Sequence, residues 1–460
     1  MESVLNNLEA KYLKFKLGEE QRDALLSIFA FIDSKGFGDY SLAGAAGTGK
    51  STVTKLIISY LEQKCIPYQL VCPTHKAKKI LANMTQREVI TIHQLLALKP
   101  SIDIMDLDMK DLQFAMKSDN SIPYHGVIIV DECSMINDAL YDAIMQGCYD
   151  KNCKVILQGD SSQIKPVKQH TIAKTFKCKN ASELTQIYRQ SGQNCVRDLL
   201  DVLRKKPLKE FQSNTSPDGN IYVYDNAKDL IFNTIDIFKE AVNTQNPNRI
   251  KLVAYTNKRV QAFNKCIRTH IFKQDDLPEY VKGDILFGYD STECRGHSIE
   301  NSGDYQIHSA FKTKEMIGHT EMNGWWVDVY DFDQEQYKTL FILSTDNDRS
   351  AFERLGEEIE DIRQYAINAQ GYRRKQAWTD YYKLMGKFLT PIDIVWDNRV
   401  IRCKSIDYGY AISAHKSQGS SFDDVAVDIN NILTCKDMTE VRQLEYVAIS
   451  RTRRNAYLLN

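Results

Sequence analysis

An eight-residue segment, Gly44–Ser51, constrains the fold of this chain more than any other feature. Its sequence, GAAGTGKS, matches the pattern G-x-x-x-x-G-K-[ST]. The glycines of such a loop let backbone N–H groups turn inward around phosphate oxygens, and the helix that follows offers its positive end to the same anion. The segment therefore predicts a strand, a phosphate-binding loop and a helix in succession, together with a bound nucleotide.

Individual residues of this loop have distinct expected roles. Lys50 supplies a point charge for the β- and γ-phosphates, and the hydroxyl of Ser51 is a ligand for Mg²⁺. The competing interpretation is a glycine-rich turn without a ligand, and the apolar run before the loop and the helical pattern after it argue against that. The residues expected to contact ATP are Gly44, Gly47, Thr48, Gly49, Lys50, Ser51 and Thr52.

Polar side chains end two further apolar runs. Asp131 and Glu132 follow the run VIIV, and Gln163 lies just beyond the run VILQ. Because open α/β sheets bind ligands at the carboxyl ends of their strands, we expect these side chains near the phosphate loop. Asp131 would bind Mg²⁺ through its water shell, Glu132 would polarise the attacking water, and Gln163 would report loss of the γ-phosphate. A solvated strand end is the alternative for the acidic pair.

Apolar runs without polar alternation, separated by helical patterns, predict a doubly wound α/β fold with parallel sheets buried on both faces. A second set of such runs predicts a second α/β layer. Residues 97–124 are too polar for the sheet, residues 284–346 alternate like a small antiparallel barrel or sandwich, and residues 349–388 have a helical pattern. The apolar runs are Tyr40–Ala43, Tyr68–Cys72, Val127–Val130 and Val155–Gln158 in the first set, and Lys251–Tyr255 and Val425–Ile429 in the second.

Composition limits the class of protein. With 460 residues, 43% apolar and 26% charged, the chain is expected to form several globular domains, which excludes disorder and coiled coil. Its 59 basic and 60 acidic residues give no global field, so a nucleic-acid partner must be argued from local sites. The 11 cysteines have no zinc-ligand spacing, and neither a signal peptide nor a membrane-spanning run is visible. We expect reduced thiols, no membrane partner and a location in the cytoplasm, that of the host if a phage encodes the chain.

The succession of motifs resembles superfamily 1 helicases, especially the 5′-to-3′ branch that contains the RecD and Dda types (superfamily 1B). The likeness covers about 18–190, 250–265 and 404–457 and is weak across the segment between the last two. Ser450 stands where the family usually has threonine, which preserves the hydroxyl. The stretches that carry the resemblance, besides those above, are Gly18–Gln21, Pro73–Lys79, Thr91–His93, Leu184–Gln190, Tyr410–Gly419 and Tyr446–Arg453.

This resemblance implies a domain organisation. Residues 1–96 and 125–180 would form a first RecA-like domain, with a pin at 97–124 that splits the duplex. Residues 181–283 and 399–460 would form a second RecA-like domain. Residues 284–398 would form an SH3-like β-barrel whose helical arm carries five aromatic residues, which we expect to be core. These are Tyr365, Tyr372, Trp378, Tyr381 and Tyr382.

The resemblance also implies roles for further residues at the nucleotide. Gln21 would read the adenine edge, and Gly419 would lie beside the nucleotide. Arg189 and Arg451, both in the second α/β set, would neutralise charge on the γ-phosphate transition state, as arginine fingers do. They would complete the site when the two domains close, which would couple closure to ATP and opening to hydrolysis.

A third implication is a track of single-stranded DNA held through its phosphates, with local positive charge from Lys76, Lys78 and Lys79. Phe114 is either a wedge that stacks on the last base pair or a core residue. The residues expected at the DNA are Pro73, Thr74, His75, Thr91, His93, Phe114, Thr256, Asn257, Ser413, His415 and Lys416.

Together with this resemblance, the sequence predicts an ATP-dependent, Mg²⁺-dependent DNA helicase that moves 5′-to-3′ along single strands and unwinds forked DNA as a monomer. A single-strand-binding protein or a replisome component is a candidate partner. Three alternatives stay open: a translocase that displaces proteins with little unwinding, a P-loop switch or small-molecule kinase, and a DNA-binding module with a relict site. An RNA track is also open, because phosphate contacts do not read the sugar.

Overall fold

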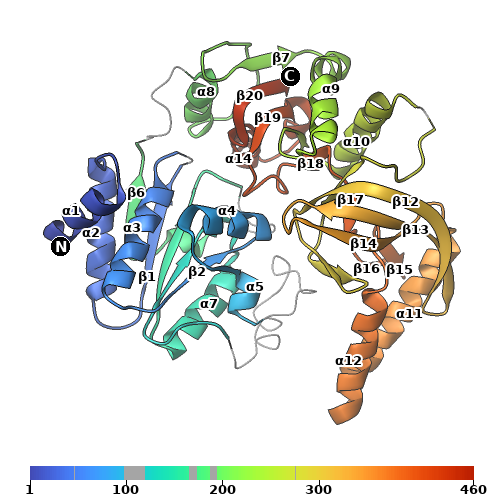
Figure 1. Ribbon diagram of the computed structural model, residues 1–460, viewed down its shortest axis with the longest axis horizontal. Helices are drawn as coiled ribbons and strands as arrows, with labels where there is room; N and C mark the ends of the chain where they lie inside the picture. The colour runs from blue at the N-terminus through green and yellow to red at the C-terminus, as the bar shows by residue number, and fades with distance from the viewer. Residues whose placement is uncertain (46, 98–119, 165–172, 187–193, 275) are drawn as a thin grey trace. The chain divides into compact units, whose positions relative to one another are not determined.

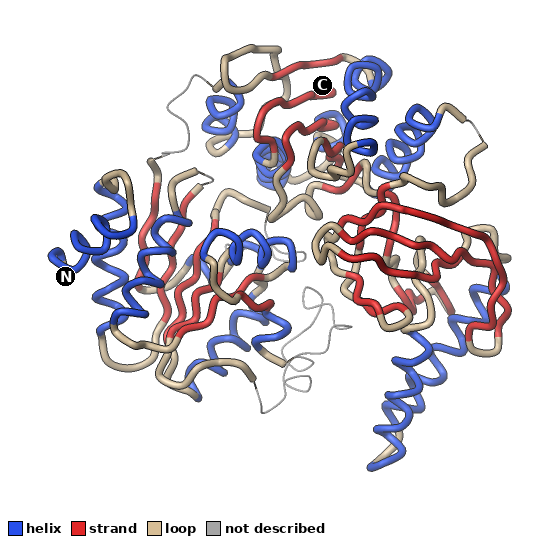
Figure 2. Tube along the Cα trace, in the orientation of Figure 1, coloured by secondary structure: helices blue, strands red, loops and turns tan. Residues whose placement is uncertain are grey.

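A computed structural model describes residues 1–45, 47–97, 120–164, 173–186, 194–274 and 276–460 (Figures 1 and 2). The chain divides into two compact units. The first contains residues 1–222, 418–420 and 432–456, and the second contains residues 223–417, 421–431 and 457–460. The predicted division into RecA-like domains, pin and barrel stays a prediction.

The first unit contains a six-stranded sheet whose neighbouring strands are all parallel, in the order β3-β2-β4-β5-β1-β6. In its register, Asp39 of β1 pairs with Val155 of β5, and Tyr40 pairs with Asn180 of β6. This order puts the ends of β1, β4 and β5, where the sequence predicts the nucleotide site, side by side. The strands are β1 (Asp39–Gly44), β2 (Tyr68–Cys72), β3 (Val89–Thr91), β4 (Val127–Val130), β5 (Lys154–Gly159) and β6 (Asn180–Leu184).

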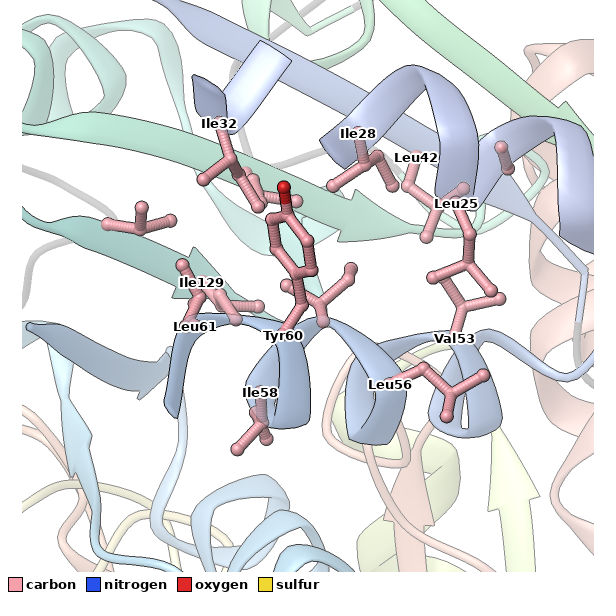
Figure 3. Packing of buried hydrophobic residues seen from close by; sticks show 14 of the residues in the cluster. Leu25, Ile28, Ile32, Leu42, Val53, Leu56, Ile58, Tyr60, Leu61 and Ile129 are labelled. Atoms are coloured by element: carbon pink, nitrogen blue, oxygen red, sulfur yellow. The ribbon is translucent and has the colours of Figure 1, made fainter. Parts of the chain in front are cut away.

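Both faces of this sheet are buried, as the unbroken apolar runs predict. Successive strand side chains point to opposite faces, so Val127 and Ile129 of β4 join one core cluster and Ile128 and Val130 join another. Figure 3 shows the first cluster, in which residues of α2 and α3 pack together with Leu42 and Ile129 from the sheet. The α/β class with parallel sheets is confirmed.

Helices connect these strands. Those of the first unit are α1 (Glu2–Tyr12), α2 (Glu19–Asp33), α3 (Lys50–Gln63), α4 (His75–Thr85), α5 (Ile92–Leu95), α7 (Asp138–Asp150), α8 (Cys195–Leu203) and α14 (Met438–Ser450), with 3₁₀ turns at Cys133–Met135 and Lys174–Phe176.

A second sheet has the order β18-β8-β19-β20-β7, and β8 is parallel to both of its neighbours. The predicted strands near 251–255 and 425–429 correspond to β8 and β19. Its elements are β7 (Ile221–Tyr224), β8 (Ile250–Ala254), β18 (Ala411–Ser413), β19 (Phe422–Asp428) and β20 (Thr452–Leu459), with α9 (Ala227–Asn243), α10 (Asn257–Phe272) and α13 (Ile429–Ile432) between them.

An antiparallel sheet with the order β14-β13-β12-β9-β17 belongs to the second unit. Helices α11 (Arg349–Asn368) and α12 (Gly371–Met385) lie between strands β14 and β17 of this sheet in the sequence and form the helical segment that the sequence predicts. The strands are β9 (Ile285–Gly288), β12 (Asp304–Ile317), β13 (Thr320–Asp331), β14 (Gln336–Leu343) and β17 (Ile406–Tyr408), and two small hairpins comprise β10 (Thr292–Cys294) with β11 (His297–Ile299) and β15 (Ile394–Trp396) with β16 (Arg399–Arg402).

The expectation that the aromatic residues of the helical arm are core is wrong for two of them. Tyr365 is 58% exposed and Tyr372 is 81% exposed. In α12 only Ala377 and Leu384 are buried, which is one residue on the same face every two turns. This helix therefore has a narrow buried stripe, and Tyr372 lies outside it and faces solvent.

All 11 cysteines lie among the described residues and are free thiols, as the sequence predicts. None of the helices in the described part of the chain combines the length and the apolar character that crossing a bilayer requires.

Candidate nucleotide site and nucleic-acid interface

The phosphate-binding loop joins β1 to α3. Gly47 and Gly49 have φ values of +90° and +85°, a region that glycine enters without steric cost, and Gly49 is the N-cap of α3. The ammonium of Lys50 donates to the carbonyl oxygens of Gly44 and, at 3.0 Å, of Ala45. The buried hydroxyl of Thr48 donates to the Ala45 carbonyl at 2.9 Å. The loop therefore keeps the amine of Lys50 folded over its own backbone.

Gln21 contacts this loop from α2. Its side chain is buried, and Nε2 donates to the carbonyl of Thr48 at 3.0 Å while Oε1 accepts from the N–H of Gly18 at 3.2 Å. These two bonds fix the start of α2 against the loop. The predicted contact of Gln21 with adenine stays a prediction.

The two acidic residues after β4 lie in the electrostatic field of Lys50. Burial raises the pKa of Asp131, and Lys50 and a bond from Gln158 act in the opposite direction. Burial also raises the pKa of Glu132, the charge of Asp131 adds to this, and Arg451 and Lys50 oppose it. Glu132 has a φ of +54°, and its N–H donates to Asp131 Oδ1 at 2.9 Å. A carboxylate with a raised pKa is suited to accept a proton from water.

Gln163 lies against Glu132. Its Nε2 donates to Glu132 Oε2 at 3.4 Å, and its Oε1 accepts from the hydroxyl of Ser134 at 3.5 Å. Gln163 is itself buried. The amide that the sequence predicts at the γ-phosphate is therefore next to the predicted general base.

Arg451 is also part of this cluster. Its guanidinium is buried and donates to the carbonyls of Val447 and Ser420. Its charge opposes the increase that burial causes in the pKa of Glu132. Gly419 lies beside Thr74, whose Oγ1 is 3.6 Å from the position that a Cβ on Gly419 would occupy. Arg189, its predicted companion, lies outside the described residues.

The donor set fits a magnesium ion that a nucleotide brings with it. Ser51 is exposed in the first turn of α3, and Asp131 directly follows β4, where the charge of Lys50 lowers its pKa against the effect of burial. Among the described residues, no three His, Cys, Asp or Glu side chains are grouped to hold a metal without a ligand. Mg²⁺ commonly takes one or two protein oxygens together with substrate phosphates, which is what Ser51 and Asp131 offer.

The predicted DNA contacts of the first unit stand at helix starts. Thr74 is the N-cap of α4 and its Oγ1 accepts from the N–H of Ala77 at 3.2 Å. Thr91 is the N-cap of α5 and accepts from the N–H of Gln94 at 3.3 Å. Both hydroxyls therefore order the N-terminal ends of helices, where the helix dipole is positive. Pro73, His75 and His93 are partly exposed next to them.

The predicted contacts of the second unit form another group. Thr256 is the N-cap of α10, its hydroxyl donates to Asn431 at 3.3 Å, and Asn257 is exposed. The ring of His415 is 6.4 Å from that of Tyr255. Ser413 accepts from the N–H of Lys416 at 3.3 Å, and the Lys416 ammonium donates to the Tyr289 carbonyl at 2.7 Å. Phe114 lies outside the described residues.

Comparison with known proteins identifies the family. A model of the AAA domain matches residues 39–169, and a model of the UvrD-like helicase C-terminal domain matches residues 408–459. The ATP-dependent DNA helicase dda of Enterobacteria phage T4 is 26% identical over 470 residues, which cover 96% of this chain and 98% of that protein. The chain is an ATP-dependent helicase of the Dda and RecD type.

Two further curated relatives are RecD proteins. The RecBCD enzyme subunit RecD of Buchnera aphidicola subsp. Schizaphis graminum is 23% identical over 513 residues, covering 98% of this helicase and 73% of that protein. The ATP-dependent RecD2 DNA helicase of Deinococcus radiodurans is 32% identical over 156 residues, or 34% of this helicase and 20% of that protein. Among solved structures, the Pif1 helicase from Candida albicans has a TM-score of 0.47 at 16% identity, covering 97% of this helicase and 94% of that chain.

Sequence reasoning missed several buried polar contacts of this helicase. The hydroxyl of Thr54 donates to Gln158 at 2.7 Å, and Tyr446 donates to Asp160 at 2.7 Å. Glu445, the residue before Tyr446 in α14, is also buried. These five residues stand in or next to the motifs of the sequence analysis. That position in the sequence was the one indication of a functional role that they offered.

Proposed function

We propose that this helicase moves 5′-to-3′ along single-stranded DNA and separates duplex at a fork, with ATP hydrolysis in the first unit driving each step. The observation that carries the proposal is the cluster around Glu132. The amide of Gln163 is bonded to it, and the charges of Lys50 and Arg451 both act on its pKa. These are the residue types that phosphoryl transfer to water requires.

The proposed chemistry assigns one task to each side chain. Glu132 accepts the proton of the attacking water, and Gln163 orients that water or reports the γ-phosphate. Lys50 and Arg451, together with Arg189, neutralise charge that develops on the transferred phosphoryl group. Mg²⁺ held by Ser51 and Asp131 would supply further neutralisation of the phosphate charges.

The proposed track contacts use helix starts and small polar side chains. Thr74, His75, Thr91 and His93 in the first unit, with Ser413 and His415 in the second, suit phosphate oxygens and carry no base-reading pattern. DNA as the track, the polarity, the pin at 97–124 and an SH3-like barrel at 284–398 are supported by likeness to the Dda and RecD helicases. The names of those relatives specify DNA.

The test measures ATP hydrolysis with and without single-stranded DNA, followed by unwinding of duplexes with a 5′ or a 3′ tail. We expect stimulation by DNA and unwinding of the 5′-tailed substrate only. The variant Lys50→Ala is the control and should abolish turnover in both assays. Hydrolysis indifferent to DNA would contradict the motor, unwinding from a 3′ tail would reverse the polarity, and stimulation without unwinding would favour a protein-displacing translocase.

A further inference from the structure

A buried hydrogen bond joins the turn after β5 to helix α14. The hydroxyl of Tyr446 donates to Asp160 Oδ2 at 2.7 Å, and the two side chains are 1% and 3% exposed. Both residues belong to the first unit. Burying the Asp160 carboxylate without a hydrogen-bond donor would cost free energy, so folding favours the arrangement in which Tyr446 donates to it.

The Asp160 end of the bond holds the turn that presents Gln163. Asp160 Oδ1 accepts from the N–H of Ser162 at 2.9 Å, and the Asp160 carbonyl accepts from the N–H of Gln163 at 3.2 Å. Gln163 in turn donates to Glu132 at 3.4 Å. Asp160 is therefore two hydrogen bonds away from the predicted general base through its backbone carbonyl, while its carboxylate holds the same turn at Ser162.

The Tyr446 end of the bond holds the helix that presents Arg451. Helix α14 ends at Ser450, Arg451 is its C-cap, and the Arg451 guanidinium donates to the carbonyl of Val447, the residue after Tyr446. The guanidinium of Arg204 lies 5.6 Å from the centre of the Tyr446 ring. The Tyr446 side chain is thus fixed on both its polar and its aromatic parts.

We propose that the bond between Tyr446 and Asp160 is a positioning contact for hydrolysis. It holds Gln163 and Arg451 in fixed positions relative to each other, so that both can act at the γ-phosphate. The inference rests on the roles proposed for those two residues. Neither Tyr446 nor Asp160 touches the reacting atoms in this scheme. Loss of the bond leaves nucleotide binding to the phosphate loop intact, and it lowers the rate of the chemical step because two transition-state groups lose their common support.

The test compares Tyr446→Phe with the wild type in steady-state ATP hydrolysis. Because small displacements of positioned groups cost up to about 100-fold in rate, we expect kcat to fall about 10- to 100-fold while KM for ATP changes less than about threefold. Asp160→Ala should give a similar loss. The double variant should be no slower than Asp160→Ala alone, because the Tyr446 hydroxyl has already lost its bond once the Asp160 carboxylate is removed.

Two further variants separate positioning from a merely structural role. Tyr141→Phe removes an equivalent bond in the same unit, from the Tyr141 hydroxyl to Asp39 Oδ2 at 2.6 Å, and should leave kcat unchanged. Asp160→Asn keeps a polar partner for the Tyr446 hydroxyl and should retain more activity than Asp160→Ala. Circular dichroism confirms that each variant is folded at the assay temperature.

The proposal is overturned if Tyr446→Phe keeps wild-type kcat, or if it loses no more than Tyr141→Phe. Additive losses in the double variant would also overturn it. If Tyr446→Phe does not fold, the comparison of Asp160→Asn with Asp160→Ala decides in the same way. A wild type that hydrolyses ATP without stimulation by DNA would contradict the proposed function and still leave this comparison valid.

Discussion

At the scale of single residues, Glu132 is the side chain on which hydrolysis depends. Its pKa is raised by burial and by the charge of Asp131, so a substantial part is protonated at lower pH. A base must be ionised to accept a proton, so the hydrolysis rate should rise as pH increases through this raised pKa. Glu132→Gln should keep ATP binding and lose hydrolysis by at least about 100-fold, with no pH dependence in the residual rate.

Nucleotide binding measured by fluorescence, in parallel with phosphate release from pH 5 to 9, checks this prediction. Full turnover in Glu132→Gln would remove the residue from the reaction. A wild-type rate that falls as pH increases over the same range would give the opposite sign and exclude Glu132 as the group that titrates.

A second residue-scale prediction concerns stability. Burial raises the pKa of Glu445 from 4.5 to about 7, and within the described part of the chain its carboxylate accepts one hydrogen bond, from the N–H of Leu208 to Oε2 at 3.0 Å. The folded protein thus binds a proton that the unfolded chain releases above its ordinary pKa. The resulting stabilisation is complete below pH 4.5 and is lost as pH increases through 7, by up to about 3 kcal/mol.

Urea unfolding between pH 4.5 and 8 tests this. The wild type should lose free energy of unfolding relative to Glu445→Gln as pH increases, because glutamine stays neutral throughout. Parallel profiles for the two proteins would show that Glu445 does not titrate in this range. Arg442→Gln, in the same helix, is the control. Because it keeps Glu445, its free energy of unfolding should depend on pH as that of the wild type does.

Residues that share a short motif could be predicted from the sequence, and residues that meet through the fold could not. Lys50, Ser51 and Glu132 are recognisable because the loop and the strand end encode their surroundings locally. The partners Asp160 and Tyr446 are 286 positions apart, and no local pattern encodes their bond. The same holds for Thr54 and Gln158, which are 104 positions apart.

At the scale of elements, the antiparallel sheet depends on a close backbone approach at Gly288 in β9. A Cβ there would lie 2.2 Å from the carbonyl oxygen of Glu300, a backbone atom that cannot rotate away. The N–H of Gly288 also donates to Gly303 at 2.9 Å, which ties the strand to the same loop. Gly288→Ala should therefore lower the stability of this sheet by about 1–3 kcal/mol.

Thermal unfolding followed by tryptophan fluorescence is a direct measurement, because Trp325 and Trp326 lie in β13 of this sheet. Lys314→Ala is the matched control, since Lys314 and its partner Glu321 are both about 60% exposed and such pairs contribute little. An unchanged midpoint for Gly288→Ala would show that the loop at Glu300 can move aside.

The positions of helices and strands could be predicted from the sequence where one hydrophobic pattern continued along the whole element. The run Val127–Val130 is β4 itself, and α3 begins at Lys50, at the end of the phosphate-binding segment, as the motif predicts. The alternation across residues 284–346 predicts antiparallel strands, and one of them, β12, has 14 residues. A register shift between Ile307 and Ser309 changes which side chains face inward, so the alternation that marks a strand is interrupted within one continuous element.

At the scale of the whole molecule, the formal net charge of −1 means that binding to a nucleic acid depends on a few local cations. Lys78, Lys79 and Lys416 are the lysines at the proposed track that are partly exposed, whereas Lys76 is buried. Single strands release counterions with a slope of about −0.7 per neutralised phosphate. Three such contacts predict a slope of about −2 for the logarithm of the binding constant against the logarithm of salt concentration.

Fluorescence anisotropy of labelled single-stranded DNA from 50 to 300 mM salt measures this slope. Lys78→Gln should weaken binding and reduce the slope by about 0.7, because one phosphate contact is lost. Lys239→Gln, at a partly exposed lysine of α9 paired with Asp236, should change neither quantity. A slope steeper than about −4 would mean that many more cations contact the strand, and the track would then have to run over surfaces other than the helix starts at Thr74 and Thr91.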